Sequence, residues 1–268
     1  YICNPCVVVH SFQIELTDDK IKGLMIAIGL SVVVHMVLII GSEILSFIFH
    51  FNSIEKASII YTNAGYLVIP LVGAVLGEEW VFYTTAFILV QTVLMWTHGV
   101  KLIGQEKELN IRKILCNPNV IAMIIGIALF ALEIRLPTVV DSCVSGFGDM
   151  ISPASMMVIG MVIGDVDLKW VFRQKRPYLI CLLRLIVFPL IAVVAFAGLE
   201  RSGIHPDAEY ILMIVLIATS APAAAMITQL AQIYEKDSRY ASVINVMSVI
   251  CCIITMPLMV LIYEMLIG

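Results

Sequence analysis

The chain has 268 residues, of which 61% are hydrophobic and 13% charged, and its mean hydropathy is +1.02. Soluble domains carry about 45–50% apolar and about 25% charged residues. This composition excludes a soluble enzyme, a nucleic-acid-binding protein and a disordered chain, and it predicts a polytopic membrane protein. The formal net charge of −4 is too small to indicate a partner.

Runs of about 20 mostly apolar residues, the length that crosses a bilayer as a helix, follow one another along almost the whole chain. In chain order they occupy residues 1–16, 23–50, 57–76, 80–100, 118–134, 149–166, 177–199, 208–233 and 240–266. The first run begins without methionine and without the charged segment of a signal peptide, so we expect some N-terminal residues to be missing. Spans this closely spaced leave no room for a soluble domain.

The short connections differ in their content of Lys and Arg, which sets the orientation of membrane helices. The connection 101–116 holds four basic residues, and we assign it to the cytoplasmic side. Alternation of the spans then places 167–176, 234–239 and Lys56 on the same side, which collects eleven of the 16 basic residues there. This topology predicts a multi-pass protein of the cell membrane (plasma or inner) with an extracytoplasmic C-terminus.

Several spans are interrupted by proline next to small or polar residues, and the interruptions come in pairs. Pro5 and Pro153 each lie near the start of a span, and Pro70 and Pro222 each break a later one. The first and second proline of each pair are separated by 65 residues in the first half and 69 in the second. Because an odd number of spans lies between the halves, the sequence predicts an inverted repeat.

The two halves differ in their number of spans. Residues 117–268 hold five, whereas residues 1–100 hold four and lack a counterpart to the segment that begins at Asn117-Pro118; residues 101–116 form the connector. We therefore expect an all-α membrane protein with a five-plus-five inverted repeat whose first helix is missing.

Paired broken helices in an inverted repeat indicate the binding site of a transporter. Proline removes an N–H donor and leaves half-helix ends at membrane depth, where only protein or a watery cavity can satisfy them. A single proline more often kinks a packed helix, but two in matching positions, with Asn63 and Ser220 beside them, favour a site. Two half-helix N-termini, each with about half a positive charge, would attract a carboxylate.

The residues around these breaks resemble the auxin efflux carrier family, also called the PIN-like or malonate/malate permease group. The resembling motifs are Asn63-x-Gly65-Tyr66-x-x-x-Pro70 with Gly77, Asn117-Pro118-x-Val120-x-Ala122 with Gly126, Ser152-Pro153 with Gly160, Ser220-Ala221-Pro222 with Ala231, Tyr234 and Asp237, and Ser248 with Pro257. As an ordered set they cover essentially the whole chain.

This resemblance implies a ten-helix fold shared with bile-acid/sodium symporters, in which two broken helices cross in a transport domain that moves against a scaffold. The family's crossing point falls here on 63–70 and 220–222. Bacterial relatives are associated with malate and malonate, and plant relatives with auxin. The connector is too short to be the long loop of the plant carriers, which favours a bacterial-type member.

Candidate substrate-binding residues lie at the two breaks and on neighbouring spans: Asn63, Gly65, Tyr66, Pro70, Gln91, Ser220, Ala221, Pro222 and Ser248. The Asn63 amide can donate to a carboxylate, although it could also cap the broken helix. Gln91 could face the same cavity or form a hydrogen bond between helices.

Ionisable groups inside membranes are functional candidates. His35 and Glu43, eight residues apart in the span 23–50, are the candidates for a coupling ion such as a proton, although Glu43 could be hydrated at the end of its span. For Arg184, within the span 177–199, the sequence favours a side chain that snorkels to the cytoplasmic interface over one that opposes a substrate charge.

The sequence therefore predicts a secondary or facilitative transporter of a small organic anion, a mono- or dicarboxylate such as malate or malonate, working by alternating access. Coupling to a proton, or none, is favoured over sodium because the breaks hold little acid, but a sodium symporter and a ligand-binding sensor on the same fold are alternatives. A homodimer is a further expectation. No catalytic motif such as HExxH is present, and we expect no enzyme activity, cofactor or metal.

Overall fold

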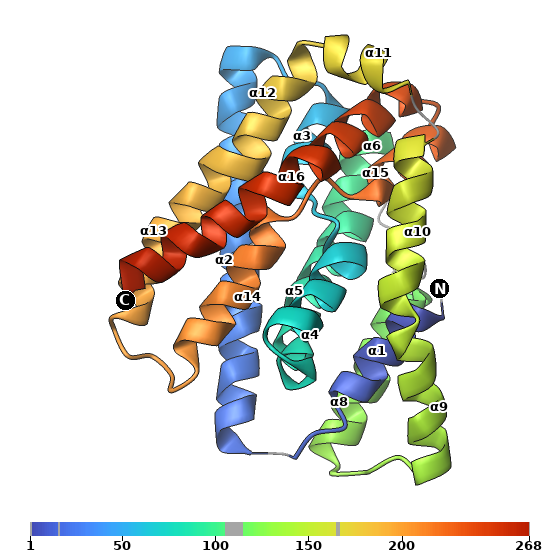
Figure 1. The fold of residues 1–268 in the computed structure, drawn as a ribbon, viewed down its shortest axis with the longest axis vertical. Coiled ribbons are helices and arrows are strands. Elements are labelled where there is room, and N and C mark those ends of the chain that lie inside the picture. Colours follow the sequence, from blue (N-terminus) through green and yellow to red (C-terminus); the bar gives the residue numbers. More distant parts are fainter. Residues whose placement is uncertain (1, 16, 105–114, 165–166, 268) are drawn as a thin grey trace.

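The computed structural model describes residues 2–15, 17–104, 115–164 and 167–267. This part of the chain is almost entirely helical and contains no strand (Figure 1). The first half consists of α1 (Cys3–Ser11), α2 (Asp18–Phe49), α3 (Ser53–Ile60), η1 (Ala64–Val68), α4 (Ile69–Val75), η2 (Glu78–Trp80), α5 (Val81–Leu94), η3 (Met95–Gly99) and α6 (Val100–Gly104).

The second half of the described chain follows in the order α8 (Pro118–Ala131), α9 (Thr138–Asp149), α10 (Ile151–Gly164), α11 (Leu168–Arg173), α12 (Arg176–Leu182), η4 (Leu183–Val187), α13 (Phe188–Glu200), α14 (Ala208–Ser220), α15 (Ala225–Ile233) and α16 (Ser238–Ile267). The connector 101–116 lies largely outside the described residues.

Within the described residues, four continuous helical stretches are long and apolar enough to cross a membrane, in agreement with an all-α membrane protein. They are Asp18–Phe49, Glu78–Gly104, Arg176–Glu200 and Ser238–Ile267. The expected spans 57–76 and 208–233 are each divided, into α3 and Ala64–Val75 and into α14 and α15. The second division falls at Pro222, as predicted, whereas the first falls at 61–63, before Pro70, which lies inside the helical stretch Ala64–Val75.

The expected span 149–166 differs from the structure because a second helix precedes it. α9 runs into α10 with only Met150 between them. The apolar pattern misses α9 because Asp141 and several small and polar residues interrupt it, while the helix still forms after Pro137. The helical segment therefore begins at Thr138, earlier than the predicted start at residue 149.

Two prolines inside long helices are accommodated by a wider π-helical turn just before them. η1 ends two residues before Pro70, and η4 ends two residues before Pro189. Proline clashes with the preceding turn and removes a hydrogen bond there, and π-turns are a common way of absorbing such an interruption and often mark functional sites. The residues in these turns include Gly65, Tyr66 and Arg184.

The helices form two groups, which Figure 1 shows on opposite sides of the molecule. α1 packs against α8 and α9, and α10 also contacts α1 and α9. The larger group is built around α14, whose residues 211–220 are all buried and which packs against α2, α5, α13 and α16. Contacts between the groups include those of α5 with α1 and α8 and those of α10 with η1, α4 and α16.

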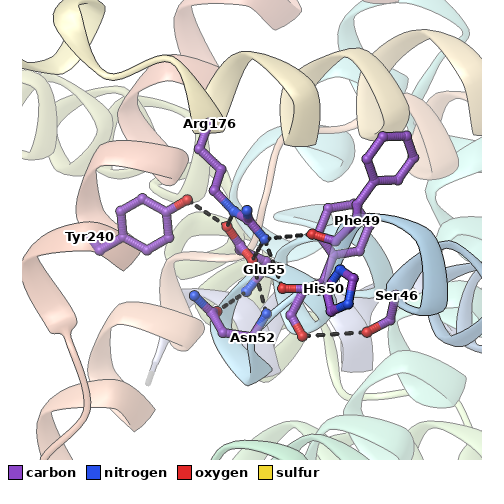
Figure 2. A network of polar contacts seen from close by, with 8 residues as sticks. Ser46, Phe49, His50, Asn52, Glu55, Arg176 and Tyr240 are labelled. Atoms are coloured by element: carbon purple, nitrogen blue, oxygen red, sulfur yellow. Dashed lines mark hydrogen bonds and ion pairs between the residues drawn. The ribbon is translucent and has the colours of Figure 1, made fainter.

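An ion pair between the buried Glu55 carboxylate and the half-exposed Arg176 ties three helices together at one end of the molecule (Figure 2). Glu55 is the third residue of α3, where it completes a capping box with Asn52, and its side chain is 0% exposed. Arg176 of α12 pairs with the Glu55 carboxylate, with Nη2 at 3.1 Å from Oε2, and the Tyr240 hydroxyl of α16 donates to Oε1 at 2.7 Å. Nη2 of Arg176 also donates to the carbonyls of Phe49 and His50.

Glu55→Gln tests this network, since it keeps the size and the capping contact but removes the charge. Hydrogen bonds to charged groups contribute about 1.5–3 kcal/mol each, and for a chain of this size roughly 2–4 °C of Tm corresponds to each kcal/mol. We expect Glu55→Gln to lower the Tm of the purified protein by about 5 °C, measured by thermal denaturation in detergent.

The matched control is Glu43→Gln, because Glu43 also pairs with a cation, Lys56, at 2.7 Å but is 45% exposed. Exposed pairs contribute about 0–1 kcal/mol, so its Tm should change by less than about 2 °C. Equal losses in the two variants would contradict the special role given to the buried Glu55 carboxylate.

Candidate functional site

The two interrupted helices meet through their backbones. Thr62 and Ala223 form an antiparallel bridge. The N–H of Asn63 donates to the carbonyl of Pro222 at 2.8 Å, and the N–H of Ala224 donates to the carbonyl of Tyr61 at 3.1 Å. Backbone N–H and C=O groups that lack an intrahelical partner at one break thus form hydrogen bonds with those at the other break. The absence of water at membrane depth makes such pairing necessary.

On one side of this bridge, Gln91 of α5 holds Thr62 with its side-chain amide. Its Oε1 accepts from the backbone N–H and from Oγ1 of Thr62, both at 2.9 Å, and its Nε2 donates to the Thr62 carbonyl at 2.8 Å. The alternative that Gln91 bonds between helices is therefore realised, and the same side chain also lines a cavity beside the bridge.

On the other side, Asn245 and Ser248 of α16 hold Ala223 in a similar way. Nδ2 of Asn245 donates to the Ala223 carbonyl at 2.7 Å, and Oγ of Ser248 accepts from the Ala223 N–H at 3.1 Å. Ser248 also donates to the Asn245 carbonyl at 2.8 Å. In both halves, the first long helix after the half-helix (α5 in the first half, α16 in the second) supplies the polar side chains that hold the break in place.

The half-helices that leave the crossing begin without a side-chain cap. Asn63 precedes Ala64–Val75 and Ala224 precedes α15, and neither makes a side-chain capping bond. The first-turn N–H groups of a helix have no intrahelical acceptor. Both first turns line one cavity of about 110 Å³, through Gly65 and Tyr66 on one side and Ala225 and Met226 on the other.

Two further cavities adjoin this one through shared lining residues. A cavity of about 280 Å³ shares Tyr66 and Trp96 with the inner one, and a cavity of about 420 Å³ shares Tyr66 and Gln229 with the second. Arg239, whose guanidinium stacks 4.1 Å above the Trp170 ring, lines the 420 Å³ cavity. α11, which carries Trp170, lies at the end of the molecule where α12 begins (Figure 1).

Three asparagines outside the candidate set line the same space. Asn4 lies in the first turn of α1, and Asn117 and Asn119 lie at the start of α8, where Asn117 caps the N–H of Asn119. All three line both the 110 Å³ and the 280 Å³ cavities. The two Asn-Pro pairs that open these helices were the signal in the sequence, but nothing local places the two helix starts together.

The helix starts determine the electrostatics of this space. The first turns of α1, α8, α15 and Ala64–Val75 line the two inner cavities, and each helix N-terminus carries about half a positive charge. Within the described residues, the lining of these cavities includes amides, hydroxyls and aromatic rings but no charged side chain. The Asn63 side chain is 6% exposed and makes no hydrogen bond in the described part of the chain. Such a site can bind an anion.

The structure brings together only part of the predicted substrate-binding set. Asn63, Gly65, Tyr66 and Gln91 line the inner cavity, whereas Pro222 and Ser248 take part in the hydrogen bonds of the crossing behind it. Ser220 and Ala221 are 0% exposed and line none of these three cavities.

Pro70 lies apart from the other candidates because the helix carries it away from the crossing. It lines a separate cavity of about 320 Å³ together with His10 of α1 and Asp149 of α9. This cavity lies between α4 and the helix group formed by α1, α9 and α10.

The two coupling-ion candidates are in different surroundings. His35 is 0% exposed, its Nδ1 lies 2.7 Å from the Ser31 carbonyl, and its ring lies against Phe87. Glu43 forms the exposed pair with Lys56 near the end of α2. Eight residues of helix separate the two by about 12 Å, and neither lines the inner cavity.

Arg184 does not snorkel, contrary to the sequence-based expectation. It is 0% exposed, the largest fully buried side chain in the described chain, and its Nη1 donates to the carbonyl of Ile59 at 3.0 Å. The flexible stem could reach an interface, but η4 faces the bundle rather than lipid and packs against α3, α14 and α16.

An all-helical membrane chain whose interrupted helices cross at a small polar cavity has the architecture of a secondary transporter. The family model described as membrane transport protein matches residues 1–111 and 107–260. The chain therefore belongs to this family, the auxin efflux carrier family of transporters. No curated protein matches the chain.

Gln91→Leu tests whether the side chain behind the crossing fixes its geometry. The change removes three hydrogen bonds and leaves buried backbone groups of Thr62 unpaired, at about 1–3 kcal/mol for each unsatisfied group. We expect the Tm in detergent to fall by at least about 5 °C.

Thr92→Val is the control, because Thr92 lines the same cavity but makes no side-chain hydrogen bond in the described chain. Its Tm should remain within about 2 °C of the parent protein. A Gln91→Leu protein as stable as Thr92→Val would argue against a crossing held by this amide.

Proposed function

We propose that this transporter moves a small organic anion, a mono- or dicarboxylate such as malate or malonate, by alternating access. The observation that supports this most directly is the pair of uncapped helix N-termini at the crossing, which line the same cavity. An uncapped N-terminus contributes about 0.3–1 kcal/mol toward a nearby anion, and up to about 2 kcal/mol where partly buried. In this proposal the protein is a transporter and not an enzyme.

Asn63 is the residue to which we assign the first carboxylate. Asn63 is nearly buried, its amide makes no hydrogen bond to any described residue, and it stands at the start of Ala64–Val75 beside the bridge. Asn4, Asn117 and Asn119 supply further amide donors on the facing helix starts. Gln91, Asn245 and Ser248 act as positioning residues that hold the crossing.

The cavity sizes favour a small substrate. The inner cavity of about 110 Å³ accepts one carboxylate group with a short carbon chain, and the adjoining 280 Å³ gives space to a second polar end. We assign the entry path of the substrate to the 420 Å³ cavity, which Arg239 lines. This cavity lies toward the end of the molecule that carries the Lys- and Arg-rich segments 167–176 and 234–239. That end is cytoplasmic in the proposed topology, with the C-terminus on the opposite side of the cell membrane.

The two helix groups supply the elements for alternating access. We propose that the group around α14 carries the crossing and moves against the group of α1, α8, α9 and α10. In this scheme, residues 1–100 and 117–268 are the two inverted repeats, joined by the connector 101–116. The separate 320 Å³ cavity beside Pro70 marks where the path would open on the other side.

The test is substrate counterflow in proteoliposomes with malate, malonate, citrate, an indole carboxylate and a neutral amino acid. We expect one of the acids to accumulate. Asn63→Ala should raise its apparent KM about tenfold or more, since an uncharged donor to a carboxylate contributes about 1.5–3 kcal/mol. Asn63→Asp should reduce uptake further, because it places a negative charge beside the bound anion.

Lys175→Ala is the matched control, because Lys175 is exposed and lines none of the three cavities. It should transport as the parent protein does. Accumulation of the neutral amino acid alone, or an unchanged KM in Asn63→Ala, would contradict the proposed site. Binding of an acid without any flux would favour a sensor.

A further inference from the structure

The crossing has negative as well as positive helix ends. α3 ends at Ile60 and α14 ends at Ser220, so the C-termini of two half-helices point toward the same crossing as the N-termini described above. Each C-terminus carries about half a negative charge. In transporters with discontinuous helices, such ends and the unwound carbonyls beside them coordinate the coupling cation.

A guanidinium already lies at the end of α3. Nη1 of Arg184 donates to the carbonyl of Ile59, in the last turn of α3. The η4 turn that carries Arg184 packs against both α3 and α14. At the end of α14, the thiol of Cys252 of α16 donates to the Ser220 carbonyl at 3.6 Å.

The charge of Arg184 has no carboxylate partner. None of the ion pairs in the described chain includes it, and its Nε and Nη2 atoms are buried without a hydrogen-bond partner. A buried charge is strongly unfavourable unless something compensates it. The C-terminus of α3 supplies about half a negative charge at the guanidinium, and the C-terminus of α14 supplies a similar charge at the same crossing.

We propose that Arg184 is a tethered counter-cation that takes the place of a coupling Na⁺ at the crossing, so that the cycle of this transporter takes up no Na⁺. Arginine suits this role because its guanidinium stays protonated and is more weakly hydrated than an ammonium group. The proposal rests on the proposed transport function, but it makes a separate claim about the protein at rest, which binding and stability measurements can test.

The first experiment compares thermal stability in chloride salts of Na⁺, K⁺ and choline at about 0.15 M, an ionic strength that screens exposed charges equally. We expect one Tm for the parent protein in all three salts. Arg184→Met should lower that Tm by about 5 °C or more, since removing one side of a buried charge interaction is strongly destabilising. Arg184→Lys, which keeps the charge, should lose less.

Arg184→Ala extends this test, because it leaves a space beside the Ile59 carbonyl that a free cation can enter. Low millimolar guanidinium, or Na⁺ compared with choline, should raise the Tm of this variant and leave the parent unchanged. Arg173→Met is the control, because Arg173 is exposed at the end of α11. It should respond to no cation.

The second experiment measures counterflow of the parent protein with Na⁺, K⁺ or choline on both sides of the membrane. Equal rates support the proposal. A rate or a Tm that Na⁺ raises specifically in the parent protein would overturn it, as would an Arg184→Met protein with the parent's stability and transport. If no acid is transported at all, the proposed function fails, and the cation series in detergent still decides the role of Arg184.

Discussion

The short backbone pairing between Thr62 and Ala223 is the interaction on which the rest of this structure depends. Two helices that stop at membrane depth expose N–H and C=O groups that lipid cannot satisfy. The bridge satisfies the innermost of these groups, and amides and a hydroxyl from α5 and α16 satisfy the next ones. The remaining first-turn donors face a cavity, and there they are available to a ligand.

This arrangement separates charge within a small volume. The helix N-termini and the neutral amides line the inner cavity. The buried guanidinium of Arg184 instead contacts the C-terminal end of α3. A site for an anion can therefore exist without any lysine or arginine on its wall. It also explains how a chain with so few charged residues can carry a polar centre, because most of its charge comes from aligned peptide dipoles.

The sequence predicted the features that follow from lipid and from proline. Apolar runs identified the long helices, since no other composition is tolerated in a bilayer. The break at Pro222 is confirmed, whereas the first break begins before Asn63 and not at Pro70, where a π-helical turn lets the helix continue. α9 was missed because Asp141 and its small neighbours interrupt the apolar pattern, although packing on α1 still supports a helix there.

The composition of the site was less predictable, because it depends on contacts between distant segments. Asn4 and Asn117 meet only because α1 and α8 pack with their first turns side by side. Arg184 was expected at an interface, since the preference of a long basic side chain for water is strong and its burial depends on α3 and α14 ending beside it. The sequence around Glu55 does not predict its ion pair, because Arg176 and Tyr240 lie more than a hundred residues away in the chain.

The crossing itself is made of main-chain atoms, and this affects how such a protein can change over evolutionary time. Almost any small side chain is compatible with a backbone bridge, so positions 62 and 223 are free to drift as long as the chain there stays extended. Selection instead acts on α5 and α16, where an amide or hydroxyl side chain must form a hydrogen bond with the bridge. Distant relatives should therefore be easier to align by a single polar residue in the middle of an apolar helix than by the residues at the crossing.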